Sequence, residues 1–230
     1  MLEKTLVNGS TSEAYRYILA SRSPRRLELL RLIVPAASIE VLPPRSPHEA
    51  SFDGLPDRPA IDFRFTDIAR AKCDDVREQL SQREASESDR RDGDRRVIIA
   101  ADTVIIATDV AGRPVVLGQP PEDEFQHEAV RLWFRELFAG RTHEVVTALC
   151  VAMPDGKQIE RISCTTVWFR PDVERYLDWY LSTGEPRGKA GGYAIQGAGS
   201  VFVLQIDGSL SNVIGLPLEE LLDVLSDFRV

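Results

Sequence analysis

Segment 21–26 (SRSPRR) is the first of three stretches whose residue types could perform chemistry. A Ser-rich turn there precedes a predicted helix that begins at Pro24, with Ser23 as its N-cap. The free N–H groups and the dipole at a helix start favour an anion. Arg25 and Arg26 oppose that dipole, which makes sense if they bind a phosphate chain. An ordinary capped helix with two solvated arginines explains the segment equally well.

The second stretch places a carboxylate inside an apolar run. Residues 97–107 read VIIAADTVIIA, a β-branched pattern typical of a buried strand, and Asp102 interrupts it. A lone buried carboxylate is costly unless a hydrogen-bond network, a metal or a functional cleft supports it. In α/β sheets such clefts lie at the carboxyl ends of strands. The alternative is a strand break in which a satisfied Asp faces a turn.

The third stretch is rich in glycine and follows a predicted helix. Residues 184–199 read GEPRGKAGGYAIQGAG and predict a long flexible loop. Long loops in compact domains are often functional. The amide of Gln196 offers both a donor and an acceptor, so it could recognise the edge of a nucleotide base. A glycine-rich surface hinge is the simpler alternative.

Composition and missing motifs exclude several classes of protein. The 230 residues carry a net charge of −8 and a pI near 5.0, which argues against a nucleic-acid-binding protein with a basic groove. No apolar run is long enough to span a bilayer, and the first residues do not resemble a signal peptide. The three cysteines form no CxxC pair and are predicted to be core residues, and the histidines lack zinc-site spacing. We therefore expect a cytoplasmic protein that binds neither nucleic acid nor a membrane.

Strands and helices alternate along the chain. The patterns predict an α/β fold in which helices flank a single elongated mixed β-sheet, with a cleft between two lobes, as one domain over residues 1–230. Segment 81–96 (SQREASESDRRDGDRR) is predicted to be a flexible polar insertion, since it has no apolar face to bury. The predicted strands are 16–20, 38–42, 96–107, 144–152, 159–169 and 201–206, and the predicted helices are 24–32, 63–80, 122–138, 172–181 and 217–225.

Seven motifs occur in one order: SRSPRR, IARAK, ADT, LGQP, GRTHEVVTA, GEPRGKAGGYAIQG and IDGSLSNVIGLPLEEL. Together they resemble the Maf family of nucleoside triphosphate pyrophosphatases, from about Ile18 to Leu222. The resemblance implies an ITPase/Maf-like fold, hydrolysis of a nucleoside triphosphate to the monophosphate and pyrophosphate, a divalent cation (Mg²⁺ or Mn²⁺), and a homodimer. It also implies removal of modified nucleotides. Arg25, Thr103 and Gln196 resemble the dTTP/UTP branch rather than the 7-methyl-GTP branch.

The resemblance also implies residue roles. Asp102 corresponds to the catalytic proton acceptor, or to the residue that binds the metal, and Lys72 to a lysine that neutralises phosphate charge. Glu49 corresponds to an acid that could help to hold the metal. Arg25, Thr103 and Gln196 correspond to base-selecting positions. The phosphate-side residues that the resemblance implies are Ser21, Ser23 and Arg26.

Three features depart from the family pattern. Gln119 stands in LGQP where a lysine is usual, so a positive charge near the phosphates is missing. His48 stands where an Asp is common beside Glu49, and segment 81–96 is longer than usual. The loss of the lysine favours an alternative function, a catalytically weak nucleotide-binding regulator of cell division. The presence of Asp102, Lys72, Arg25 and Arg26 favours the enzyme.

Overall fold

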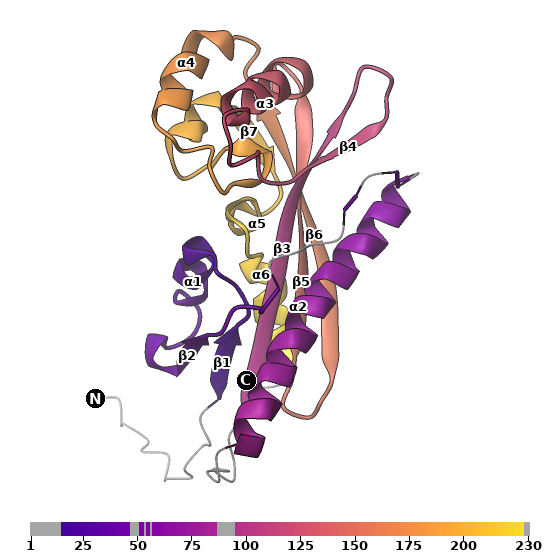
Figure 1. Ribbon diagram of the computed structural model, residues 1–230, viewed down its shortest axis with the longest axis vertical. Coiled ribbons are helices and arrows are strands. Elements are labelled where there is room, and N and C mark those ends of the chain that lie inside the picture. Colours follow the sequence, from indigo (N-terminus) through magenta and orange to yellow (C-terminus); the bar gives the residue numbers. More distant parts are fainter. Residues whose placement is uncertain (1–14, 47–50, 53, 56, 87–94, 228–230) are drawn as a thin grey trace, which may run out of the picture.

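A computed structural model describes residues 15–46, 51–52, 54–55, 57–86 and 95–227 (Figure 1). Within these residues seven strands form one mixed sheet in the order β2-β1-β3-β5-β6-β7, and β4 pairs with β3. The pairings β1–β2 and β1–β3 are parallel and the others are antiparallel. The strands are β1 (Arg16–Leu19), β2 (Ile39–Val41), β3 (Arg96–Thr108), β4 (Pro114–Leu117), β5 (Thr142–Ala152), β6 (Gln158–Phe169) and β7 (Val203–Asp207).

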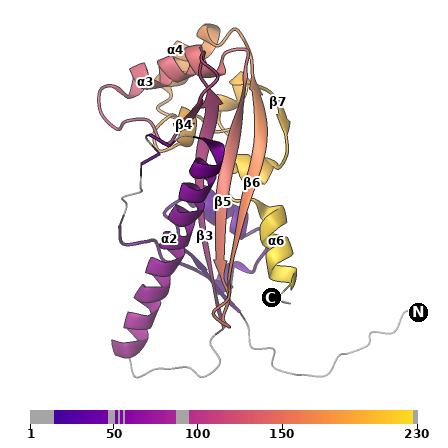
Figure 2. The same cartoon turned by 90° about the vertical axis from the view of Figure 1, so that its right-hand side faces the viewer.

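Helices cover both faces of the sheet. α2 crosses one face, whereas α6 lies on the other (Figure 2). No helix within the described ranges is long and apolar enough to cross a membrane. The helices are α1 (Pro24–Leu30), α2 (Arg58–Ser86), α3 (Gln126–Leu132), α4 (Glu174–Ser182), α5 (Leu210–Ile214) and α6 (Leu218–Asp227), with short helices η1 (Ala36–Ser38), η2 (Trp133–Phe138), η3 (Ala190–Gly192) and η4 (Ala198–Phe202).

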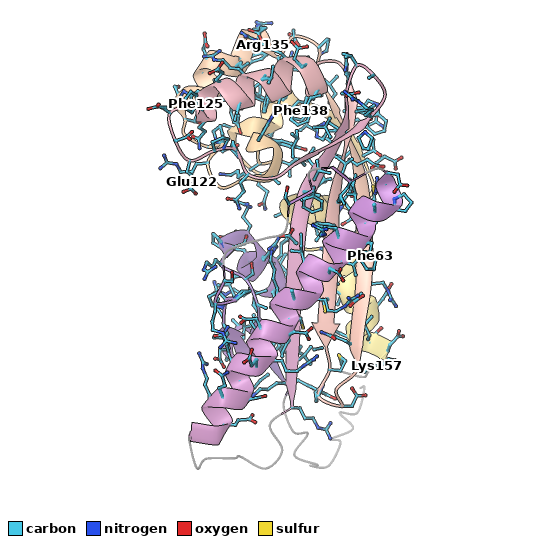
Figure 3. All side chains as sticks on the ribbon, turned by 45° about the vertical axis from the view of Figure 1, so that its right-hand side comes forward. Phe63, Glu122, Phe125, Arg135, Phe138 and Lys157 are labelled. Carbon is cyan, nitrogen blue, oxygen red and sulfur yellow. The ribbon has the colours of Figure 1, made fainter. Side chains whose placement is uncertain are left out.

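β3 contributes side chains to three clusters of the apolar core. Two of them lie on opposite faces of the sheet, because successive side chains of a strand alternate between its faces, and the third lies further along the strand. Ile98 and Ala100 pack with α2, and Ile99 packs on the opposite face with α1 and α6. Further along the same strand, Ile105 joins an aromatic cluster formed with η2, α4 and η4. Phe138 of this third cluster lies in the part of the molecule opposite to Lys157 (Figure 3). A single strand therefore connects the cores at the two ends of the molecule.

One side of β3 has an open stretch. β1 pairs with β3 as far as Ile99, and β4 pairs with it on the same side only from Ile105 onward. Asp102 and Thr103 lie in this gap, while β5 pairs with them on the other side. The strand continues through Asp102 without a break. The alternative of a strand break at this Asp is therefore wrong.

α2 extends beyond both ends of the predicted helix 63–80. It begins at Arg58 because the Asp57 side chain accepts a hydrogen bond from the backbone N–H of Ala60, an N-cap followed closely by a proline. It continues to Ser86, so the first part of the predicted polar insertion 81–96 is helical. Residues 87–94 of that segment lie outside the described residues. The buried side chains of α2 recur at helical spacing, as the pattern predicts: Ile61, Phe65, Ala69, Cys73, Val76 and Leu80.

Two short elements were not predicted, and two other sequence predictions need correction. β4 and α5 are too short for the periodicity to reveal, and neither was predicted. The helix predicted over 122–138 begins at Gln126 and continues as a π-helix from Trp133, and Phe125, just before its start, is exposed. Cys164 is exposed, whereas Cys73 and Cys150 are buried as predicted.

Candidate active site

A cleft of about 670 Å³ opens beside the gap in β3. We distinguish two of its walls by the elements that form them. The α1 wall comprises residues 20–26, Lys72, Asp102, Thr103 and residues 213–215. The loop wall comprises Gly118, Gln119, Glu122, residues 188–190 and residues 193–196. Every predicted site residue lines the cleft except Glu49, which lies outside the described residues.

A lysine–carboxylate pair lies in the α1 wall. The Nζ atom of Lys72 is 2.5 Å from Oδ1 of Asp102, and both side chains are largely buried. Asp102 points to the α2 face of the sheet, because it shares that face with Ala100 and Val104. Among the described residues no donor contacts Oδ2 of Asp102. That oxygen can therefore accept a hydrogen bond from a water or bind a cation.

Arg26 connects three segments of the same wall. Its Nε donates to the backbone carbonyl of Gly215 at 2.8 Å, one Nη to the Ser21 hydroxyl at 3.2 Å, and the other to the Thr103 hydroxyl at 3.0 Å. The Thr103 hydroxyl also lies 3.0 Å from that of Thr147 on β5. Thr103 therefore faces the opposite side of the sheet from Asp102, towards α1 and α5. Both reach the cleft because no strand covers this edge of β3.

The start of α1 matches the sequence prediction. The Ser23 side chain accepts a hydrogen bond from the backbone N–H of Arg26, and Pro24 is the first helical residue. The Ser21 hydroxyl accepts a hydrogen bond from the backbone N–H of Ser23 at 3.1 Å. The two serines therefore shape the turn that brings Arg25 and Arg26 to the cleft.

Arg25 and Lys189 place two cations on opposite walls. Within the described residues Arg25 has no hydrogen-bond acceptor and no ion pair. Burial lowers the pKa of Arg25, although the charges of Glu185 and Glu28 oppose this shift. Burial also lowers the pKa of Lys189, and the positive charge of Arg25 lowers it further, against the effect of Glu185. Two partly desolvated cations that repel each other favour a bound polyanion.

Gln119 and Gln196 are exposed side chains of the loop wall. Neither has a hydrogen-bond partner among the described residues, so both amides are available to a ligand. Gln196 lies in a turn closed by a hydrogen bond from the N–H of Gly197 to the carbonyl of Ala194. Segment 184–199 contains two short helices, and most of its residues are at least partly buried, so the prediction of a long flexible loop is wrong.

The sequence interpretation missed Lys189, Arg22, Glu122 and Tyr193, which also line the cleft. Lys189 lies within the GEPRGKAGGYAIQG motif, for which the sequence analysis gave only Gln196 a role. Its Nζ donates to the carbonyls of Glu185 at 2.5 Å and Arg187 at 3.5 Å, so the backbone orients it. Its position opposite Arg25 depends on the tertiary fold. Neighbouring residues in the sequence give no signal for it.

The described side chains of this cleft could hold a divalent cation only together with the phosphates of a bound nucleotide. The described residues hold no group of three or more His, Cys, Asp or Glu side chains that could bind a metal by themselves. Asp102 and Glu122 are the carboxylates that line the described part of the cleft. Mg²⁺ is commonly bound by one or two carboxylates together with substrate phosphates and water. Asp102 would be the residue that holds such an ion.

A family model described as "Maf-like protein" matches residues 16–228, nearly the whole chain. This protein belongs to the Maf family. The motifs that carried the resemblance therefore come from a true family relationship.

Curated relatives of this Maf protein are similar over almost their whole length. A dTTP/UTP pyrophosphatase of Brucella abortus is 38% identical, over 93% of this chain and 91% of its own. One of Anaeromyxobacter sp. is 35% identical over 92% and 89%, and one of Bartonella quintana is 34% identical over 99% and 93%. Among solved structures, a dITP/XTP pyrophosphatase of Mycobacterium abscessus shares 14% identity with a TM-score of 0.36, over 68% of this chain and 74% of that one.

Proposed function

We propose that this Maf protein hydrolyses dTTP and UTP to the nucleoside monophosphate and pyrophosphate. The observation that carries the proposal is the Asp102 carboxylate, which is paired with Lys72 at an open strand edge inside a cleft with cations on both walls. The named activity of relatives that are 34–38% identical supports the same substrates.

The reaction needs a water that attacks the α-phosphorus. Asp102 would orient this water through Oδ2 and accept its proton as the new P–O bond forms. The bond from the α-phosphorus to the bridging oxygen then breaks, and pyrophosphate leaves with the bonding electrons. Lys72 holds the Asp102 carboxylate in position before the attack, because the Nζ atom of Lys72 lies 2.5 Å from Oδ1 of Asp102.

Positive side chains would neutralise the triphosphate. Lys72 and Arg25 would approach it from the α1 wall and Lys189 from the loop wall, so the leaving pyrophosphate would be bound between the two walls. Arg26 acts through Ser21 and Thr103, whose hydroxyls it orients. In the alternative role of Asp102, Oδ2 would instead hold a divalent cation, which would supply charge stabilisation to the phosphates. That Glu49 helps to hold this cation stays a prediction.

Gln196 would recognise the base. Its amide can donate to one and accept from another polar atom of a pyrimidine edge, whereas a guanine would leave these groups mismatched. Thr103 would act on base selection indirectly, because its hydroxyl already contacts Arg26 and Thr147. The homodimer implied by the family stays a prediction.

Gln119 supports a second candidate function, a nucleotide-binding regulator with weak catalysis. It lines the cleft at the position where the family usually has a lysine. Lys189 on the same wall argues against this candidate, because it supplies a positive charge close by.

A nucleotide panel with Mg²⁺ or Mn²⁺ tests the proposal. The products are separated so that pyrophosphate release is distinguished from orthophosphate release. We expect pyrophosphate from dTTP and UTP at higher kcat/KM than from purine nucleotides. Binding without release of pyrophosphate from any nucleotide would instead support the regulator.

A further inference from the structure

His143 and Tyr193 form a buried polar contact beneath the loop wall. Nε2 of His143, on β5, lies 2.8 Å from the hydroxyl of Tyr193, and both residues are buried. The imidazole packs against Phe138 and Phe169, with ring centroids 4.3 Å and 4.9 Å away. Nδ1 of His143 is buried, and none of the described residues forms a hydrogen bond with it. A core of apolar residues would avoid this penalty, so the contact with Tyr193 needs a reason.

Tyr193 connects this contact to the cleft. It lines the cleft itself, and the turn that carries Gln196 begins at the next residue, Ala194. The side chain therefore fixes one end of that turn. The other end is fixed by Glu185, whose carboxylate accepts hydrogen bonds from the N–H groups of Ala198 at 2.6 Å and Gly199 at 2.8 Å. Gln196 lies between the two anchors.

The residues before Tyr193 are held equally closely. Gly191 and Gly192 have φ of 65° and 72°, and a Cβ at either position would lie within 3.0 Å of Ile105 or Val130. The Tyr180 hydroxyl donates to the carbonyl of Gly192 at 2.7 Å. The backbone therefore reaches Tyr193 in a fixed direction, and the direction in which it continues depends on where the Tyr193 ring is held.

We propose that His143 is a positioning residue for base recognition, which holds Tyr193 so that the following turn presents the Gln196 amide to a pyrimidine base. This inference rests on the proposed function and deepens it. His143 does not touch the ligand. It acts through one hydrogen bond to Tyr193, and the loss of that bond lets the turn move relative to the phosphate-binding side chains of the α1 wall.

The test uses binding of α,β-imido analogues of UTP and GTP, in which the bond that the enzyme would cleave resists hydrolysis. Calorimetry with Mg²⁺ gives the ratio of the two Kd values for wild type, His143→Phe, Tyr193→Phe and the double variant. Thermal or urea unfolding gives their stabilities. Phe65→Leu, in the α2 core away from the loop, is the control for a general loss of stability.

We expect each single variant to lower the preference for UTP about tenfold, the size of one neutral hydrogen bond. Each also loses stability because one buried polar group is left without a partner. The double variant recovers much of the stability, since both partners are then apolar, but not the preference. His143→Gln, whose amide can still reach the Tyr193 hydroxyl, retains part of the preference.

Three results would overturn the inference: an unchanged preference in folded single variants, recovery of the preference in the double variant, or an equal loss in Phe65→Leu. A wild type that binds both analogues equally would overturn it as well. Failure of the proposed function is a separate result: wild type would then discriminate the analogues but release no pyrophosphate from UTP.

Discussion

The two walls of the cleft are stabilised in different ways. In the α1 wall the functional side chains bind one another: Lys72 contacts Asp102, and Arg26 contacts Ser21 and Thr103. In the loop wall Gln119 and Gln196 have no partners among the described residues, and the backbone behind them is anchored instead. The α1 wall would therefore bind and hydrolyse the triphosphate with side chains that are already held in place. The loop wall would recognise the base with unpaired amides on a fixed backbone. The following predictions test this difference, from the largest expected effect to the smallest.

Asp102→Asn should lower the hydrolysis of UTP by about 10³-fold or more, because an amide cannot accept the proton of the attacking water. Binding of the α,β-imido analogue should persist, since the amide keeps the shape of the side chain. Steady-state kinetics and calorimetry measure the two effects. Asp109→Asn, in the exposed β3–β4 turn, is the matched control. Turnover at the wild-type rate in Asp102→Asn would exclude the assigned role.

Arg25 and Arg26 are neighbours in the sequence with different surroundings. Arg26→Ala should lower stability by about 2 kcal/mol, since several hydrogen bonds are lost and the buried Ser21 is affected, and kcat/KM by about 100-fold. Arg25→Ala should change stability by less than about 0.5 kcal/mol and mainly raise KM. Urea unfolding and kinetics of both variants check this. Equal losses of stability would show that the α1 wall is not held by Arg26.

His143 makes stability depend on pH. Burial lowers its pKa to about 3 from an ordinary value of 6.5, so the unfolded chain binds a proton that the folded chain does not. This contribution to stability is complete above pH 6.5 and is lost as the pH falls towards 3, by up to about 1.4 kcal/mol per pH unit. Tyr193, Phe138 and Phe169 face the ring. Urea unfolding at pH 4–7 should show a shallower slope for His143→Gln than for wild type.

Gln119→Lys should raise turnover about two- to fivefold, because an added cation in the loop wall stabilises the leaving pyrophosphate. The effect is small because Lys189 already places a positive charge in that wall. Kinetics of the variant with and without Lys189→Gln measure the contribution of each cation. An unchanged rate in both backgrounds would show that position 119 does not reach the phosphates.

The sequence predicted the long elements because they depend on local signals, and the family motifs identified most functional side chains of the α1 wall, although Arg22 was missed. The helical spacing in α2, the β-branched run of β3 and the Ser23–Pro24 cap each depend on residues close in the chain. Helix boundaries were less accurate, since the Asp57 cap was not considered. β4 and α5 have too few residues to show a period.

The loop wall was predicted less well because tertiary contacts organise it. Glycines in segment 184–199 indicated flexibility, yet Gly191 and Gly192 allow the backbone to pack against Ile105 and Val130, which come from other elements. The partners of His143 and Lys189 are likewise set by packing. Gln196 was identified from the family motif, whereas its anchors could be identified only in the structure.

The gap beside β3 also affects how the molecule behaves in a crowded solution. An unpaired strand edge on the outside of a sheet is a template for adding a strand of another chain, and so for aggregation. Here the stretch between Ile99 and Ile105 is enclosed by α1 on one side and the 188–196 loop on the other. A small ligand can reach this edge, but another polypeptide would first have to displace both walls. The cleft thus makes a reactive edge accessible to substrate while protecting it from other chains.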